Sequence, residues 1–201
     1  IPKNIKDPAA YEFCYQPTLW PKIDAFKKTW ETYYAAMEDL AKRIMAAFAE
    51  ALGLESSYFD RFISNPISAL RALHYPTTTD AIIEKQQRAG AHTDYGSLTI
   101  LLPQVGTTGL QIKKKNSWID VPALEDCLII NIGDLMELWT AGRWVSTLHR
   151  VIARPNQPPR KSLAYFHQPD WDSIINPINS NNYESVVSGP YLMDKFKSTN
   201  L

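Results

Sequence analysis

The second half of the chain is a series of short apolar runs that alternate with turn residues. Most of these runs have the length of a β-strand and are shorter than most helices. The runs are "SALRALHYP", "SLTILLPQ", "GLQIKK", "WIDVPAL", "CLIINIG", "RWVSTLHRVIA" and "KSLAYFHQP". Short strands at regular spacing, separated by turn signals, predict an antiparallel sandwich or barrel. Within this series, "KNSW" with Asn116 and "TAGR" with Gly142 are predicted hairpin turns.

A different pattern precedes the strands, with apolar residues at spacings of three and four. Such spacing predicts one face of a long amphipathic helix. Pro21 suits its first turn and Gly53 its C-terminal cap. The members of the stripe are Ile23, Phe26, Trp30, Tyr33, Met37, Leu40, Ile44 and Phe48. We expect this stripe to be a core face, with the helix packed outside one sheet.

A chain of 201 residues can bury a substantial core, and a single domain over residues 1–201 is predicted. Residues 1–21 are expected to be an irregular lead-in and 22–65 to be helical. Residues 66–169 form the predicted β core. Residues 170–201 form a tail with a short helix at "GPYLMDKFKS".

Composition excludes some classes of partner. Lys and Arg together number 21, as do Asp and Glu, so the formal net charge is zero, which argues against nucleic acid or an anionic membrane. No apolar run is long enough to span a bilayer, and the first residues lack a signal-peptide pattern. Two cysteines, Cys14 and Cys127, make no disulfide framework, which favours the cytoplasm. Cys127 is predicted to be a small buried residue.

The histidines indicate a metal site. His92 and Asp94 are two positions apart, so in extended backbone their side chains point to the same side. Alone, this pair is a weak signal and is better explained as a hydrogen-bonded pair at an ordinary strand entrance. His149 lies in a later strand-like run, and two hairpins fit between it and Asp94, so a rolled sheet can bring them together. Two imidazoles and a carboxylate form the facial triad of non-haem Fe(II) oxygenases, which keeps open positions.

Arg160 and Ser162 are also two positions apart, on the next predicted strand. Arginine can hold a carboxylate with two parallel hydrogen bonds, and serine adds a hydroxyl donor. Taken alone, Arg160 would be a solvated residue after the turn "NQPP". An arginine buried in a barrel without an anion would be costly. Together with the triad, the pair therefore indicates a carboxylate-binding site.

Three segments resemble a known family, the iron- and 2-oxoglutarate-dependent dioxygenases of the isopenicillin N synthase-like group. They are "HTD" at 92–94, "NIGDLMELWTAGRWVSTLHRV" at 131–151 and "RKS" at 160–162. The resemblance runs from about residue 70 to residue 166. It implies a double-stranded β-helix, or jelly roll, so the expected fold class is mainly β with flanking α.

The resemblance implies His92, Asp94 and His149 as iron ligands and catalytic residues. It implies Fe(II), O₂ and 2-oxoglutarate as cosubstrate. The expected reaction oxidises a C–H bond of a small organic substrate, by hydroxylation or by related desaturation or cyclisation, with release of succinate and CO₂. No oligomeric state is assigned. Family members carry a longer region before the long helix, so residues 1–21 are also interpreted as the remnant of a larger N-terminal region.

Cosubstrate contacts are implied at three positions. Arg160 and Ser162 match the pair that binds the far carboxylate of 2-oxoglutarate. Tyr75, in "LHYP", matches a family tyrosine that reaches the same carboxylate. Leu73 stands where many plant members have asparagine, which removes one contact.

Four further residues are considered for the site. His74 and His167 match no ligand position, and a structural role is favoured for His74. Asn131 and Trp139 are candidates for shaping the pocket, with packing as the favoured role of Trp139.

Two alternatives stay open. An oxidase like isopenicillin N synthase would use Fe(II) and O₂ without 2-oxoglutarate, and the R-x-S pair would hold the substrate. A non-catalytic jelly-roll binding domain would need no iron ligands. A zinc hydrolase is less favoured, because "YGSLT" after Asp94 offers no carboxylate as general base.

Overall fold

The computed structural model describes residues 5–77, 86–180 and 184–199. The chain divides into two compact units. The first comprises residues 1–69, 138–141 and 167–201, and the second comprises residues 70–137 and 142–166. The single domain expected over the whole chain stays a prediction.

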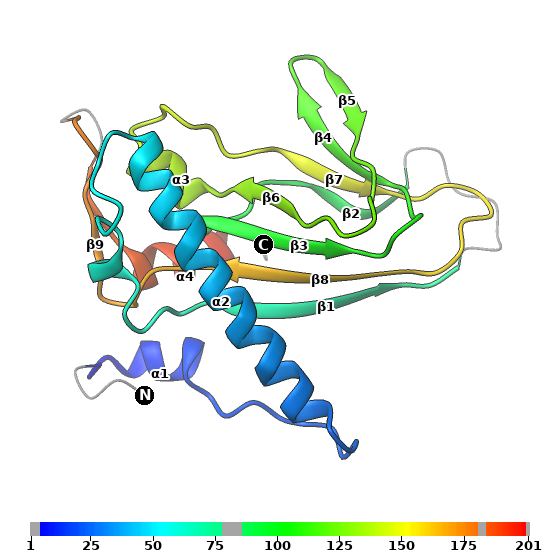
Figure 1. Ribbon diagram of the computed structural model, residues 1–201, viewed down its shortest axis with the longest axis horizontal. Helices are drawn as coiled ribbons and strands as arrows, with labels where there is room; N and C mark the ends of the chain where they lie inside the picture. Colours follow the sequence, from blue (N-terminus) through cyan, green and yellow to red (C-terminus); the bar gives the residue numbers. More distant parts are fainter. Residues whose placement is uncertain (1–4, 78–85, 181–183, 200–201) are drawn as a thin grey trace. The chain divides into compact units, whose positions relative to one another are not determined.

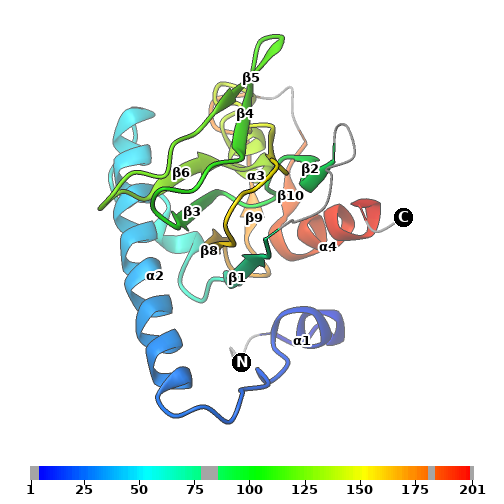
Figure 2. The same cartoon turned by 90° about the vertical axis from the view of Figure 1, so that its right-hand side faces the viewer.

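The second unit is built on two four-stranded sheets (Figures 1 and 2). The first sheet has the order β1 (Ala69–Tyr75), β8 (Arg160–His167), β3 (Leu98–Pro103), β6 (Ile129–Ile132). The second has the order β2 (Gln87–His92), β7 (His149–Ile152), β4 (Leu110–Lys114), β5 (Ser117–Asp120). Successive strands mostly alternate between the sheets, which is a jelly-roll arrangement. The predicted jelly roll is confirmed.

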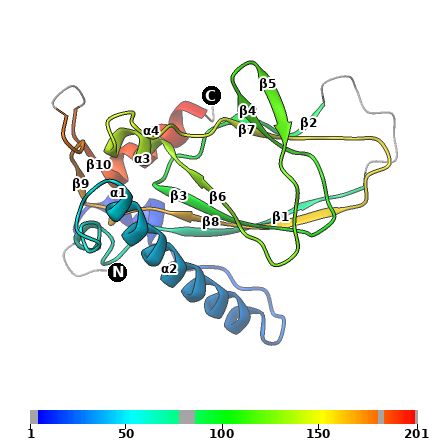
Figure 3. The ribbon, with the colours of Figure 1, turned by 45° about the horizontal axis from the view of Figure 1, so that its top comes forward.

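One predicted hairpin is confirmed. Lys114 pairs with Ser117 across the β4–β5 turn, and Lys115 has φ of 52°. This leaves a two-residue loop, which is the tightest hairpin connection. Figure 3 shows the hairpin extending from the second sheet.

The other predicted hairpin, at "TAGR", is wrong. This segment ends a short helix, α3 (Asp134–Trp139), which the strand pattern did not predict. Gly142 has φ of 74° and donates its N–H to the Glu137 carbonyl at 2.8 Å, as a glycine does at a helix end. A helix of six residues is too short to show its own period in the sequence.

The first unit is mainly helical. Its elements are α1 (Pro8–Cys14), α2 (Phe26–Ala51), η1 (Asp60–Phe62), β9 (Ile174–Ile175), β10 (Val186–Val187) and α4 (Ser188–Thr199). The C-terminal helix is confirmed. The lead-in expected to be irregular contains α1, whose first turn is capped by the Asp7 carboxylate at 2.9 Å from the Ala9 N–H. In the described part of the chain, no helix combines the length and hydropathy of a membrane span.

The long helix α2 is confirmed, but its start and its buried face differ from the prediction. It begins at Phe26, after Ala25 with φ of 60°, and not at Pro21. Gly53 follows its end with φ of 76°, as expected of a cap. The buried residues are Met37, Ala41, Met45 and Ala49. Only Met37 belongs to the predicted stripe. Two of the other three are alanines, which give a weak apolar signal although their small size permits close packing.

Two single-residue predictions have opposite outcomes. Cys127 is exposed, not buried, since it precedes β6 in a turn where Asp126 has φ of 53°. Trp139 is fully buried within the first unit. Its ring packs edge-on against Phe59 and Phe62, with centroids at 4.8 and 5.0 Å, so its packing role is confirmed.

His167 is also buried, at the end of β8. Burial and, to a smaller extent, the positive charge of Lys42 together lower the pKa of its imidazole to about 4. The side chain is therefore neutral at physiological pH and does not line the pocket described below.

We expect this burial to make stability depend on pH. In the unfolded chain His167 takes up a proton near its ordinary pKa of 6.5, whereas the folded imidazole does so only at about 4. The free energy of unfolding should therefore fall by about 3 kcal/mol as pH decreases between these values. Urea unfolding of the metal-free protein across this range measures the fall. A His167→Gln variant with the same pH dependence as the wild type would contradict the prediction.

Candidate functional site

The second unit contains a pocket of about 730 Å³, a volume typical of small-molecule sites. Residues of both sheets line it. All six predicted site residues are among them: Tyr75, His92, Asp94, His149, Arg160 and Ser162. Folding therefore brings together residues that are up to 87 positions apart in the sequence.

Strand pairing places the two histidines beside each other. His92 and His149 are directly opposite in the antiparallel β2–β7 pair, and their ring centroids are 4.3 Å apart. The Asp94 Oδ1 atom lies 3.9 Å from His92 Nε2 and 3.8 Å from His149 Nε2. The two-residue spacing predicts His92 and Asp94 on one strand, but β2 ends at His92 and Asp94 lies in the loop that follows.

Backbone carbonyls orient both imidazoles. His92 Nδ1 lies 2.7 Å from the Gly90 carbonyl, and His149 Nδ1 lies 2.9 Å from the Thr147 carbonyl. A carbonyl oxygen can only accept, so each Nδ1 carries the proton and donates. Each Nε2 then keeps its lone pair on the side facing Asp94, as metal-binding histidines do.

Two neutral side chains hold the Asp94 carboxylate. Its Oδ2 accepts hydrogen bonds from Thr99 Oγ1 at 2.6 Å and from Asn131 Nδ2 at 2.8 Å. The residue is only 7% exposed. Fixing Oδ2 in this way turns Oδ1 toward the histidines. Asn131 thus belongs to the site, as considered from the sequence, whereas Thr99 was missed, although it is an isolated polar residue in the run "SLTILLP".

This arrangement fits a divalent metal ion. The donor atoms of His92, Asp94 and His149 all lie within 4.8 Å of one another. At 3.8 and 3.9 Å the imidazoles are too far from Oδ1 to hydrogen-bond with it. The two imidazoles and the carboxylate therefore converge on one point without forming hydrogen bonds to one another. Two neutral imidazoles and one carboxylate are the ligand set of a facial metal site.

The loop that carries Asp94 is held by the N-terminal turn of α3. The Asp134 N–H donates to the Asp94 carbonyl at 2.7 Å, and the Leu135 N–H lies 3.1 Å from the Gly96 carbonyl. Gly133 makes this approach feasible, because a Cβ there would lie 2.3 Å from the Gly96 oxygen and 2.9 Å from the Asp94 oxygen.

Arg160 and Ser162 lie along β8 as predicted, with their side chains buried and that of Lys161 exposed between them. Arg160 is 4% exposed. Burial lowers the pKa of its guanidinium, and interaction with Tyr75 partly opposes this. The guanidinium lies over the Tyr75 ring at 5.3 Å. A buried cation of this kind is suited to an anionic ligand.

Other residues of the pocket were not assigned from the sequence. Arg88 lies over the Tyr75 ring at 6.0 Å and donates to the Pro76 carbonyl at 2.9 Å. Arg71 also lines the pocket. His74, expected to be structural, is exposed and is among the lining residues.

Replacing Gly133 should weaken metal binding. In Gly133→Ala the new Cβ would displace the Asp94 loop, so we expect about tenfold weaker binding of Ni²⁺ by isothermal titration calorimetry. Gly106→Ala is the control, since its φ of 74° makes the substitution strained, while a Cβ there meets nothing within 4 Å and lies outside the residues that line the pocket. Near-UV circular dichroism verifies that both variants are folded. Equal metal affinity in both would contradict this role of Gly133.

Comparison with known proteins agrees with this geometry. Residues 66–169 match the model of the 2OG-Fe(II) oxygenase superfamily. The chain is 33% identical over 188 residues to 2-oxoglutarate-dependent dioxygenase thnC of Trichoderma harzianum, covering 91% of this chain. It is 35% identical over 191 residues to 2-oxoglutarate-dependent dioxygenase caaD of Aspergillus niger, covering 92% of this chain. It spans 58% of the length of each of these two relatives.

Solved structures share the fold. A full-length Neurospora crassa protein in complex with alpha-KG superposes with a TM-score of 0.85 and 35% identity, over 90% of this chain and 62% of that one. Its complex with alpha-KG and thymine gives 0.81 and 34%, over 92% and 60%. Because the family match covers just over half of the sequence, the chain belongs to the 2OG-Fe(II) oxygenase superfamily.

Proposed function

We propose that this protein is a non-haem Fe(II)- and 2-oxoglutarate-dependent oxygenase that oxidises a C–H bond of a small organic molecule. One observation carries the proposal: the triad and the buried Arg160–Ser162 pair line the same pocket. A metal site alone would suit many functions. A metal site that shares a pocket with a buried carboxylate-binding pair suits a keto acid with one end at each.

His92, Asp94 and His149 are the proposed metal ligands. Bound there, Fe(II) together with 2-oxoglutarate would supply the oxidising chemistry, with succinate and CO₂ as products. The protein contributes orientation. Two carbonyls fix the imidazoles, and Thr99 and Asn131 fix the carboxylate, so the donors need little rearrangement to receive the ion.

Arg160, Ser162 and Tyr75 are the proposed contacts of the far carboxylate of 2-oxoglutarate. Burial of Arg160 at 4% exposure supports this, because a desolvated guanidinium gains most from a charged partner. Tyr75 lies beside it and can add its hydroxyl group. Among the lining residues that the structure describes, Asp94 is the only carboxylate. No protein acid in that set therefore competes for Arg160.

The prime substrate is proposed to be a small molecule bound in the remaining volume of the pocket. The Neurospora crassa relative crystallised with thymine supports this class of substrate. Hydroxylation is the proposed outcome, with desaturation and cyclisation as variants of the same chemistry. The cytoplasmic location and the lack of a nucleic-acid partner stay predictions.

Arg160→Gln tests the cosubstrate site. Removal of the charge-assisted contacts should weaken 2-oxoglutarate binding to the Ni²⁺-loaded protein by about tenfold or more. Lys161→Gln is the matched control, since Lys161 is the next residue of the same strand and is exposed, whereas Arg160 is buried. Titration calorimetry measures both. With Fe(II) and O₂, the wild type should also convert 2-oxoglutarate to succinate.

The outcomes separate the alternatives. If metal binds but 2-oxoglutarate does not, and no succinate forms, the isopenicillin N synthase-like reaction is favoured. Titration with Ni²⁺ tests the other alternative, that the protein is a non-catalytic binding domain. If His92→Ala and Asp94→Ala both bind Ni²⁺ as tightly as the wild type, the triad is no metal site and the enzymatic proposal fails.

A further inference from the structure

We propose that Arg71 binds a carboxylate of the prime substrate, so that the substrate is a small organic acid. This inference rests on the proposed function, because it assigns a ligand to the same pocket. It begins from the charges of the lining residues. Three arginines, Arg71, Arg88 and Arg160, line the pocket, whereas Asp94 is the only carboxylate among the described lining residues.

The other charged groups of the pocket already have partners. One oxygen of Asp94 is held by Thr99 and Asn131, and the other faces the two imidazoles. Arg88 donates to the Pro76 carbonyl and lies over the Tyr75 ring. These contacts account for the carboxylate and for one arginine.

The two carboxylates of 2-oxoglutarate are also accounted for. In the proposed function one end of this molecule lies at the metal and its far carboxylate lies at Arg160. Arg71 therefore has no part in holding it. In the described part of the chain, no hydrogen bond or ion pair engages the Arg71 guanidinium, and the residue is exposed at the pocket.

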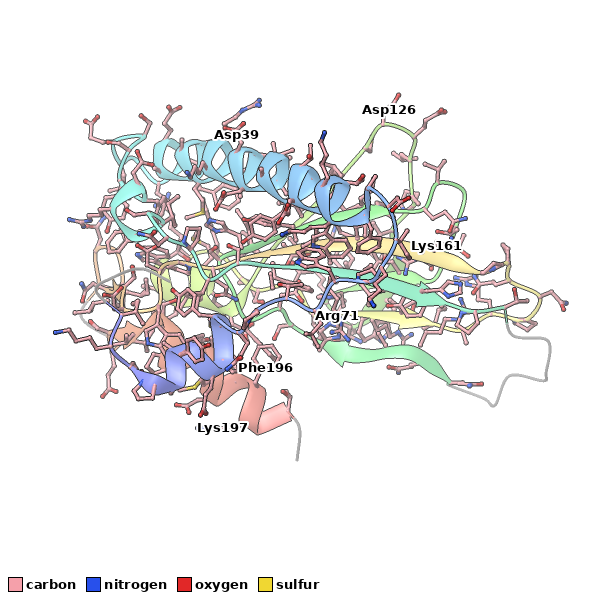
Figure 4. All side chains as sticks on the ribbon, turned by 90° about the horizontal axis from the view of Figure 1, so that it is seen from below. Asp39, Arg71, Asp126, Lys161, Phe196 and Lys197 are labelled. Atoms are coloured by element: carbon pink, nitrogen blue, oxygen red, sulfur yellow. The ribbon has the colours of Figure 1, made fainter. Side chains whose placement is uncertain are left out.

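Strand geometry separates Arg71 from the cosubstrate contacts. Arg71, Leu73 and Tyr75 alternate along β1, so their side chains share one face of the strand. Four residues of extended backbone place the Arg71 and Tyr75 Cα atoms about 13 Å apart. Figure 4 shows Arg71 on this strand. The pocket thus has two cationic positions along one strand, one beside Tyr75 and one at Arg71.

The pocket walls indicate the rest of the substrate. Apolar side chains from both sheets line it, namely Leu73, Leu101, Leu110, Ile112, Val121, Ile129, Ile130, Val151 and Phe166. The guanidinium fork matches a carboxylate in shape and charge. A compact acid with an apolar body would therefore bury its hydrocarbon part against these walls and place its carboxylate at Arg71.

Acids and their amides test this proposal. The probes are benzoic, phenylacetic, cinnamic and octanoic acids, each compared with its primary amide, which has the same shape without the charge. Binding to Ni²⁺-loaded protein is measured by titration calorimetry. We expect at least one acid to bind about tenfold more tightly than its amide. In Arg71→Gln this preference should fall below about twofold, and Arg71→Lys should retain part of it.

Two controls identify the site. Arg43→Gln removes an exposed arginine from α2 and should keep the full preference for acids. The affinity of Arg71→Gln for 2-oxoglutarate should stay within about twofold of the wild type. A parallel loss of 2-oxoglutarate binding would assign Arg71 to the cosubstrate and overturn the proposal. So would an undiminished preference in Arg71→Gln, or the absence of any acid preference in the wild type.

Each titration is made with and without saturating 2-oxoglutarate. If the wild type does not bind 2-oxoglutarate, the proposed function fails. The comparison of acids with amides on the metal-loaded protein alone then still decides whether Arg71 binds a carboxylate.

Discussion

The candidate site depends on how the Asp94 carboxylate is held. Thr99 on β3 and Asn131 on β6 both donate to its Oδ2. These strands are neighbours in one sheet, and Thr99 pairs directly with Asn131. The two histidines come from the other sheet. The Asp94 carboxylate is therefore bound to one sheet through Oδ2 and faces the histidines of the other sheet through Oδ1. A shift between the two sheets would alter the distance from Oδ1 to both imidazoles.

The pocket is asymmetric in charge. Its single described carboxylate, that of Asp94, is buried and faces the two imidazoles, whereas its guanidinium groups lie along β1, β2 and β8. In a cavity with apolar walls, such an arrangement favours anions, since the effective dielectric constant there is lower than in water.

Local patterns in the sequence predicted much of the architecture and of the site. Strand alternation around Arg160 and Ser162 correctly placed both side chains on the buried side of β8. Errors arose where a pattern was too short or too weak to read. The helix α3 has too few residues to show a period, so the turn residues of "TAGR" wrongly predict a hairpin. The buried face of α2 alternates methionine with alanine, and alanine carries little apolar signal, so the larger apolar residues at neighbouring positions dominate the predicted stripe.

The sequence by itself determined the types and order of the groups that can act: His92, Asp94, His149, and the pair at 160 and 162. Residue chemistry decides which atoms can bind a metal or a carboxylate. Only the tertiary structure decided which lone pairs face inward. Asn131 sets the orientation of the Asp94 carboxylate although it lies 37 positions away, because the pairing of β3 with β6 brings it to Oδ2. Gly133 acts similarly, since the contact that excludes a Cβ there comes from backbone of another segment.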